Sequence, residues 1–241
     1  MSEEVKRQLE AAGIIPVLRA RSAKEAIGVV EAMVAGGITV MEVTMTVPGA
    51  IDVLRELKRI YGNKLLLGSG TVTDRKECAD TIEAGAEFVV SPSLHMDVIQ
   101  ETKARDKVSL PGALTPTEVI TAWQAGADFV KVFPCSAMGG ASYLKSLKAP
   151  FPFLRLVPTG GVTLETAASF LEAGASALGV GADLVNVAAL AEGKPEVITI
   201  AARAYLDIIA RTRAASDGAN RWPFEIDAPH SGACFRRSEV Q

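Results

Sequence analysis

The sequence predicts an α/β protein of 241 residues, arranged as a (β/α)8 TIM barrel with an N-terminal helix. The first observation behind this prediction is an Ala-Gly motif that occurs four times, each time after an apolar helical pattern and before an apolar strand. Its glycines are Gly36, Gly85, Gly126 and Gly174. Successive copies lie 49, 41 and 48 residues apart, which leaves room for about two helix-plus-strand units in each interval. The second observation is composition, because 49% hydrophobic residues against 22% charged ones predict a large buried core.

Eight strands are expected along the chain. Four of them open after the Ala-Gly turns, where a glycine in the left-handed conformation ends the preceding helix. The other four lie between these turns, over residues 14–19, 64–69, 108–111 and 154–158. Helix starts support the count, since Ser22 with Glu25 and Thr115 with Glu118 have the form of capping boxes. Alternating strands and helices predict a parallel sheet, and eight units over about 210 residues fit a closed barrel.

An open doubly wound sheet is the alternative architecture. It would require a Gly-x-Gly-x-x-Gly turn after an early strand, whereas the first expected strand ends in Leu18-Arg19-Ala20-Arg21. The barrel is expected to form a single domain over residues 1–214. From Ala215 the periodicity stops, and residues 215–241 are predicted to be a poorly ordered C-terminal tail.

Charge and composition argue against several classes of function. A formal net charge of -3 supplies no basic surface for nucleic acid, and no run of 18 apolar residues exists to span a membrane. The charged N-terminus lacks the apolar centre of a signal peptide, so a cytoplasmic protein is expected. The two histidines, His95 and His230, have no second histidine or carboxylate at metal-ligand spacing, and we expect no metal site.

Lys131 stands out in the strand pattern of residues 128–134. With a period of two it shares one face with Phe129 and Phe133. An ammonium held among apolar side chains either pairs with a carboxylate or loses its proton, and a neutral amine is a nucleophile toward carbonyl groups. The alternative is a lysine near a strand end whose stem packs on the phenyl rings while its head reaches water.

Polar residues and glycine turns recur where the expected strands end, which is the end that carries the chemistry in barrels of this kind. They are Arg19, Glu42, Thr71, Ser91-Pro92, Pro111-Gly112, Lys131, Thr159-Gly160-Gly161 and Gly179-Val180-Gly181. Taken singly, Arg19 and Glu42 could form a salt bridge, and Thr71 and Thr159 could cap helices. Together, a lysine nucleophile, a carboxylate that moves protons and glycine turns able to hold an anion favour imine chemistry on a keto acid, with or without a phosphate.

Seven motifs in order resemble those of the 2-keto-3-deoxy-6-phosphogluconate (KDPG) and 4-hydroxy-2-oxoglutarate (KHG) aldolases. They are Ile15-Pro-Val-Leu-Arg-Ala20, Met41-Glu-Val-Thr-Met-Thr-Val-Pro48, Gly68-Ser-Gly-Thr-Val72, Val90-Ser-Pro92, Leu110-Pro-Gly112, Val130-Lys-Val-Phe-Pro134 and Val157-Pro-Thr-Gly-Gly-Val162. The resemblance covers residues 14–211 and implies a class I aldolase without metal or cofactor, usually a homotrimer, that takes a small keto-acid substrate.

The same resemblance assigns roles to individual residues. Lys131 matches the Schiff-base lysine and Glu42 the general acid and base. Arg19, Thr71 and Pro92 match positions at the keto-acid end, and Phe133 is grouped with the substrate-binding residues. The turns on the phosphate side are matched by Thr159, Gly160, Gly161 and Gly181.

Two departures from the family pattern bear on the substrate. Thr46 stands where some members carry an arginine, so Arg19 would hold the carboxylate alone. Members that bind phosphate commonly place serine after the glycine of the last turn, whereas this chain has Gly181-Ala182-Asp183. Asp183 is interpreted either as an acid in the first turn of a helix, which stabilises the helix dipole, or as a charge that repels phosphate.

Two other functions fit parts of the pattern. A phosphosugar isomerase or epimerase on the same barrel would use Glu42 as its base and form no imine. The other possible function is that of a non-catalytic trimeric barrel that binds an acid. Lys131 and Glu42 both being present favours the aldolase over either of them.

Overall fold

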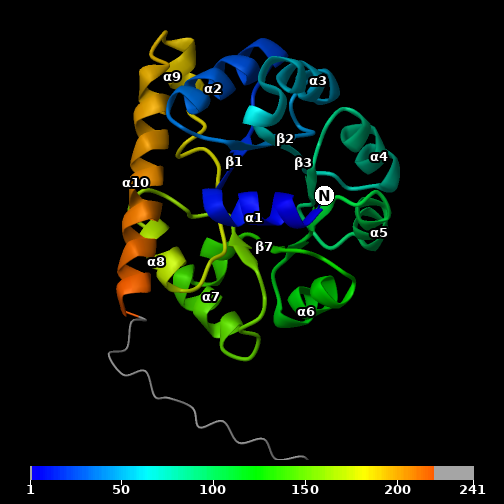
Figure 1. Ribbon diagram of the computed structural model, residues 1–241, viewed down its shortest axis with the longest axis vertical. Helices are drawn as coiled ribbons and strands as arrows, with labels where there is room; N and C mark the ends of the chain where they lie inside the picture. Colours follow the sequence, from blue (N-terminus) through cyan, green and yellow to red (C-terminus); the bar gives the residue numbers. More distant parts are fainter. Residues whose placement is uncertain (1, 220–241) are drawn as a thin grey trace, which may run out of the picture.

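The computed structural model describes residues 2–219, in which helices surround a parallel sheet (Figure 1). The strands are β1 (Ile14–Leu18), β2 (Val40–Thr44), β3 (Leu66–Gly70), β4 (Phe88–Val90), β5 (Val108–Leu110), β6 (Gly112–Ala113), β7 (Val130–Val132), β8 (Leu156–Pro158) and β9 (Leu178–Val180). The helices are α1 (Ser2–Ala12), α2 (Ala23–Ala35), α3 (Ala50–Tyr61), α4 (Arg75–Glu83), α5 (Met96–Ala104), α6 (Pro116–Gln124), α7 (Ala141–Lys148), α8 (Ala167–Glu172), α9 (Val187–Ala191) and α10 (Glu196–Ala219), with short 3-10 helices at Gly62–Lys64 and Cys135–Met138.

All strand pairs in this sheet are parallel, as the alternation of strands and helices predicts. The sheet has two sections, a six-stranded one in the order β5-β4-β3-β2-β1-β9 and a three-stranded one in the order β6-β7-β8. Pro111 alone separates β5 from β6, because a proline has no N–H to donate to the ladder. At the other junction, a parallel bridge joins Thr159, just after β8, to Gly179 of β9.

The glycine turns have the predicted conformation. Gly85, Gly126 and Gly174 have φ values of 113°, 97° and 91°, which L side chains rarely adopt. In the first copy the left-handed residue is Gly37, with φ of 100°, while Gly36 keeps a right-handed helical conformation. Each turn therefore ends a helix and sends the chain into the next strand.

Only one of the two predicted capping boxes is complete. The Thr115 side chain accepts from the Glu118 backbone N–H, and the Glu118 carboxylate accepts in return from the Thr115 N–H. Ser22 accepts from the Glu25 N–H, but the Glu25 carboxylate accepts from the backbone and guanidinium of Arg21 instead of from Ser22.

The N-terminal helix α1 lies across the ends at which the strands begin (Figure 1). Val5 and Leu9 of this helix are buried in one apolar cluster with Phe88, Val108 and Phe129, which stand at or just before the starts of their strands. The predicted N-terminal helix is thus present, and it covers this end of the sheet with apolar side chains. The opposite ends of the strands stay free for other groups.

The C-terminal helix α10 runs along one side of the molecule and packs on α8 and α2 (Figure 1). It continues through Ala219, so residues 215–219 of the predicted tail are helical. The prediction relied on apolar periodicity. It overlooked the high helix propensity of alanines such as Ala214 and Ala215, which favours a helix even where the periodicity is absent. Residues 220–241 of the predicted tail lie outside the described residues.

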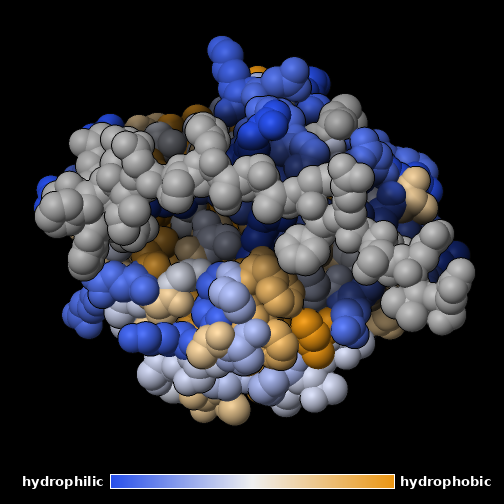
Figure 2. All heavy atoms as spheres, turned by 60° about the horizontal axis from the view of Figure 1, so that its bottom comes forward, coloured by the Kyte–Doolittle hydropathy of each residue, from blue (hydrophilic) through white to orange (hydrophobic). Residues whose placement is uncertain are grey.

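Apolar side chains also reach the surface on the side that carries α6 and α7. Figure 2 shows this side turned forward, with apolar residues gathered in the lower part of the view and hydrophilic ones above. Phe153 is 55% exposed, and its ring lies 5.9 Å from that of Trp123 and 6.2 Å from that of Phe151. No helix within residues 2–219 is long and apolar enough to cross a membrane.

Gly68 of β3 gives a direct test of the packing between neighbouring strands. It pairs with Glu42 on one side and Phe88 on the other, and a Cβ added to it would lie 2.2 Å from Cε2 of the Phe88 ring. Because backbone and ring are both fixed by close packing, we expect Gly68→Ala to lower the free energy of unfolding by about 1 to 3 kcal/mol. Urea denaturation measures the change.

The Phe88→Leu background supplies the matched comparison. There the ring is gone, so the cost of Gly68→Ala should be clearly smaller than in the wild type. An equal cost in both backgrounds would mean that the Phe88 ring is not what restricts position 68.

Candidate active site

Lys131 occupies the middle of β7 and is buried. Its register neighbours are Gly112 of β6 and Val157 of β8, and only 4% of the residue is exposed. Nζ lies 5.3 Å from the centroid of the Phe133 ring, which offers its face to the amine. The residue as a whole is therefore buried, as expected for a lysine among apolar side chains.

Glu42 occupies the middle of β2, and 2% of it is exposed. Its Oε1 is the one buried side-chain oxygen or nitrogen within residues 2–219 that has no hydrogen-bond partner. Burial raises the pKa of this carboxyl, and the attraction of Lys131 and Arg19 opposes the rise without cancelling it. A carboxyl group in this state accepts a proton more readily than an exposed glutamate does.

Gly70 makes room for this carboxyl group. A Cβ at position 70 would lie 1.9 Å from Oε1 of Glu42, so no larger residue fits between β3 and the glutamate. The motif Gly68-Ser-Gly70 is part of the family resemblance, but the sequence does not predict that Gly70 makes room for the Glu42 carboxyl group. This role depends on the Glu42 side chain of the neighbouring strand, which packs directly against the glycine.

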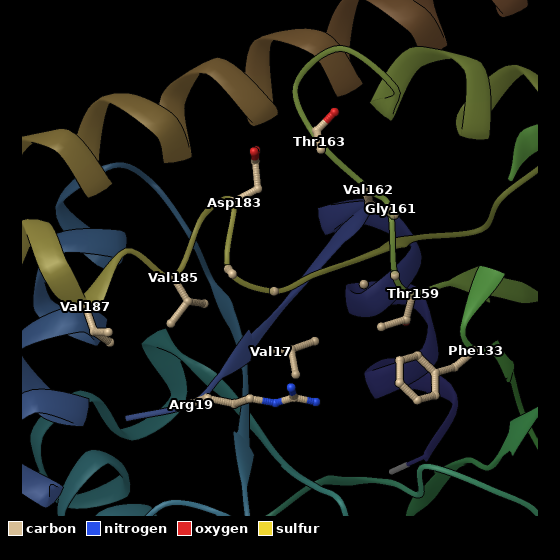
Figure 3. A pocket seen from close by; sticks show the side chains of 14 residues that line it. Val17, Arg19, Phe133, Thr159, Gly161, Val162, Thr163, Asp183, Val185 and Val187 are labelled. Atoms are coloured by element: carbon tan, nitrogen blue, oxygen red, sulfur yellow. The ribbon is translucent and has the colours of Figure 1, made fainter. Parts of the chain in front are cut away.

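Arg19 follows β1 and extends into a cavity of about 670 Å³ at the ends of the strands (Figure 3). It attracts Glu42 through space, but Glu42 Oε1 has no hydrogen-bond partner, and the salt bridge between Arg19 and Glu42 that the sequence allows is not formed. Val17, the register neighbour of Glu42, also lines the cavity. The buried carboxyl group thus lies next to residues that form the cavity wall.

The cavity collects most of the residues predicted for the substrate. Phe133, Thr159 and Arg19 surround its lower part in Figure 3, and the turns after β8 and β9 form the rest. The full lining is Val17, Arg19, Phe133, Thr159, Gly160, Gly161, Val162, Thr163, Gly179, Gly181, Ala182, Asp183, Val185 and Val187. Arg19 and Asp183 are the charged members of this set.

Thr71 and Pro92 follow β3 and β4, beside the strands of the buried pair. Thr71 has a φ of 61°, a conformation that costs a β-branched residue about 1 to 3 kcal/mol and is found mostly at functional sites. It caps no helix, because Asp74 caps α4. Pro92 lies against Gly112, where an added Cβ would stand 2.4 Å from the Pro92 carbonyl. Since Gly112 pairs with Lys131, Pro92 is brought close to the lysine strand.

The turns after β8 and β9 form the far end of the cavity. Gly160 and Gly161 have φ values of 88° and 77°, so glycine is required at both positions. Thr159 is buried and caps no helix, since α8 begins at Ala167. A Cβ on Gly179 would lie 2.1 Å from Oγ1 of Thr159, so the threonine hydroxyl lies directly over this glycine.

Asp183 does not stand in a helix. Residues 182–184 form a turn, and α9 begins only at Val187, so the interpretation as a first-turn helix acid is wrong. Its Oδ2 accepts a hydrogen bond of 2.5 Å from the hydroxyl of Tyr205 in α10. Figure 3 shows the carboxylate directed toward this helix and away from Arg19. Tyr205 was missed because nothing local in the sequence links it to residue 183.

Within residues 2–219 no group of three or more His, Cys, Asp or Glu side chains is arranged to hold a metal ion. What the site does hold is a buried amine, a buried carboxyl group of raised pKa and a cavity with one cation at its lower end. These groups can form an imine with a carbonyl compound and move a proton next to it.

Comparisons with known proteins agree with this chemistry. A model of the KDPG and KHG aldolase family matches residues 5–201. The chain is 37% identical to the 2-dehydro-3-deoxy-phosphogluconate aldolase of Zymomonas mobilis subsp. mobilis over 193 residues, which covers 80% of this chain and 89% of that protein. It is 31% identical to the 2-dehydro-3-deoxy-6-phosphogalactonate aldolase of Escherichia coli, over 81% of this chain and 96% of that one.

A solved structure extends the likeness to three dimensions. The KDPG aldolase of Legionella pneumophila, with pyruvate captured as a covalent carbinolamine intermediate, has a TM-score of 0.76 to this chain. The two are 29% identical, and the match covers 83% of this chain and 97% of that one.

The buried state of Glu42 predicts how stability depends on pH. Its pKa is higher in the folded than in the unfolded chain, so the folded protein binds more protons between the two values and loses stability as pH rises through them. We expect Glu42→Gln, which removes the titrating group, to be more stable than the wild type at pH 8, with an advantage that shrinks on going to pH 4. Urea denaturation at several pH values measures this.

Glu56→Gln is the matched control. Its carboxylate is on the surface, and hydrogen bonding to Arg59 lowers its pKa, so the substitution should bring no gain at pH 8. If Glu42→Gln is less stable than the wild type at every pH, the structure stabilises the charged carboxylate and our assignment of its state is wrong.

Proposed function

The chain belongs to the KDPG and KHG aldolase family, and from this premise we propose which of its residues carry out the reaction. It is a class I aldolase, a lyase that cleaves a keto acid by way of an imine. The observation that carries the residue assignment is the pair of buried groups, Lys131 and Glu42, held on β7 and β2 and acting on each other through space.

Lys131 is proposed as the nucleophile. Its neutral amine attacks the ketone carbon of a 2-keto-3-deoxy-4-hydroxy acid to give a carbinolamine, whose hydroxyl group takes up a proton from solvent and leaves as water, so that an iminium ion remains. The iminium accepts the electron pair of the bond between carbons 3 and 4 when that bond breaks. The position of the amine supports this role, because Nζ lies 5.3 Å from the centroid of the Phe133 ring, and Phe133 lines the cavity.

Glu42 is proposed as the proton carrier. As a carboxylate it takes the proton of the 4-hydroxyl group, the bond between carbons 3 and 4 breaks and an aldehyde leaves. The enamine that remains on Lys131 is then protonated at carbon 3, and water hydrolyses the resulting iminium to release pyruvate and the free amine. One group can serve in both steps because they follow each other, and its raised pKa favours the return of the proton.

The remaining residues are proposed to hold the two ends of the substrate. Arg19 lies at the lower end of the cavity, where its guanidinium can bind the acid group, with Thr71 and Pro92 beside the strands of the reacting pair. Phe133 borders the reacting carbons. The tail of the substrate would then lie along Thr159 and the turns at Gly160, Gly161 and Gly181.

The substrate is proposed to be an acid of the KDPG or KHG type, an intermediate of carbohydrate metabolism. The names of the relatives support this class, since one acts on the phosphogluconate and another on the phosphogalactonate derivative. The alternatives of a phosphosugar isomerase or a non-catalytic acid-binding barrel are not favoured. Neither explains the likeness to an aldolase structure in which pyruvate is bound covalently.

We further propose that the two sections of the sheet form one closed (β/α)8 barrel. The short interruption at Pro111 and the bridge between Thr159 and Gly179 support this closure. A single domain, assembly as a homotrimer and a cytoplasmic location remain predictions from the sequence and its family resemblance.

Trapping with borohydride tests the imine. Incubation with pyruvate and sodium borohydride should reduce the imine to a stable amine and add one pyruvate-derived group to the peptide that contains Lys131. Mass spectrometry of the digested protein locates it. Lys131→Ala should lose both the adduct and cleavage, whereas Lys145→Ala, at an exposed lysine of α7, should keep both.

Glu42→Gln separates the two proposed roles in the same assay. It should still be trapped with pyruvate while cleaving about 10² to 10⁴ times more slowly than the wild type, the usual contribution of a general acid-base group. Absence of any wild-type adduct would falsify imine catalysis, and an undiminished cleavage rate in Glu42→Gln would remove that residue as the proton carrier.

Comparing substrates with and without a terminal phosphate tests the tail assignment. The turns at Gly160, Gly161 and Gly181 lie in the cavity, but Ala182 offers no hydroxyl and Asp183 carries a negative charge nearby. We therefore expect kcat/KM for the phosphorylated acid to exceed that for its unphosphorylated analogue by less than tenfold, and Ala182→Ser to widen the ratio. A ratio of a thousand or more in the wild type would contradict this expectation.

A further inference from the structure

The far wall of the cavity consists of two loops that come from different strands. Residues 159–163 follow β8, and residues 181–185 follow β9. In Figure 3, Thr163 of the first loop and Asp183 of the second lie at the end of the cavity away from Arg19. A ligand that fills the cavity lengthwise touches both loops, so the distance between them decides how well its tail fits.

One side chain from outside the cavity reaches both loops. The Tyr205 hydroxyl of α10 donates to Oδ2 of Asp183 at 2.5 Å, and the Val162 carbonyl oxygen lies 3.5 Å from the same hydroxyl. Because a hydroxyl has a single proton, the short bond to Asp183 is the one that is formed, with Val162 as the long second contact. Val162 and Asp183 both line the cavity.

Tyr205 is well suited to hold a loop in place. It is 0% exposed, and it belongs to a helix of 24 residues that packs on α8 and α2. Burial and the neighbouring Asp183 carboxylate raise the pKa of its hydroxyl, which therefore stays protonated and remains a donor. A hydrogen bond to a carboxylate is stronger than one between neutral groups.

The loop that Tyr205 holds is compact, and its Leu184 and Val185 side chains are buried in the main apolar core. The backbone N–H groups of Leu184 and Val185 both donate to the Gly181 carbonyl, at 3.1 Å and 2.9 Å, which closes the turn on itself. Asp183 projects from this turn toward α10, so the bond to Tyr205 ties the closed turn to the helix. The backbone at Gly181 and Ala182 then borders the cavity in a fixed place.

We propose that Tyr205 is a positioning residue, which sets the 181–185 turn, through Asp183, against the 159–163 loop at the separation that the substrate tail requires. The inference rests on the proposed aldolase function and adds to it a residue that touches neither substrate nor the reacting groups. Lys131 and Glu42 stand on strands β7 and β2, so loss of this bond leaves the reacting end unchanged.

The test compares Tyr205→Phe with the wild type on a long and a short substrate. The phosphorylated tail of KDPG reaches the far loops, so KM for KDPG should rise about five- to tenfold while kcat stays within twofold. This pattern is expected when a substitution weakens binding of the substrate and of the transition state equally. KM for KHG, whose tail is short, should change less than twofold. Tyr61→Phe, which removes the hydroxyl of a half-buried tyrosine on α3, should change neither.

Variants of Asp183 test whether the hydrogen bond itself is responsible. Asp183→Asn keeps an oxygen that accepts from Tyr205 and removes the negative charge near the phosphate, so KM for KDPG should stay within twofold of the wild type or fall. Asp183→Ala should reproduce the effect of Tyr205→Phe, and the double variant should be no worse than either single one. An effect of Asp183→Asn as large as that of Asp183→Ala would overturn the proposal.

Two further outcomes decide the matter. Pyruvate trapping by borohydride should be equal in Tyr205→Phe and the wild type, and a wild type that does not trap would end both the aldolase mechanism and this inference. A wild type that traps, combined with an unchanged KM of Tyr205→Phe for KDPG or an equal rise for both substrates, would overturn the positioning role alone.

Discussion

The structure depends on keeping a lysine and a glutamate buried on two parallel strands, β7 and β2. Glu42 leaves one carboxyl oxygen without a hydrogen bond, an arrangement that costs folding free energy because the lost hydration is not replaced. Lys131 attracts the carboxyl group, but the raised pKa of Glu42 shows that burial outweighs this attraction. The surrounding strands and helices, with their large apolar core, offset this cost.

Glycines make the space in which these polar groups lie. Gly70 admits the Glu42 carboxyl, Gly112 admits the Pro92 loop beside the lysine strand and Gly179 admits the Thr159 hydroxyl. In each case a side chain or loop from one strand covers a glycine of the strand next to it. A methyl group at any of the three positions would displace the group that covers it, so these glycines shape the site.

The two ends of the cavity are supported in different ways. The reacting end is held by hydrogen-bonded strands, which fix Lys131 and Glu42 through the register of the sheet. The far end is formed by loops, and its position depends on a contact from α10 through Tyr205. This separation allows the tail of the substrate to vary among relatives that share one chemistry, since the loops can change while the strands remain.

By itself the sequence determined the order of strands and helices, because helical periodicity, glycine caps and capping boxes are set by residues near each other in the chain. Its motifs also identified the family and placed the glycine turns at strand ends, whereas the expectation that Lys131 and Glu42 end their strands was wrong, because both lie in the middle of β7 and β2. Only the tertiary structure decided that Lys131 is buried, that Glu42 Oε1 lacks a hydrogen-bond partner and that Asp183 faces Tyr205 and not a helix of its own. These facts depend on contacts between residues far apart in the chain, such as 42 with 70 and 183 with 205, and local patterns carry no information about which distant side chains will meet.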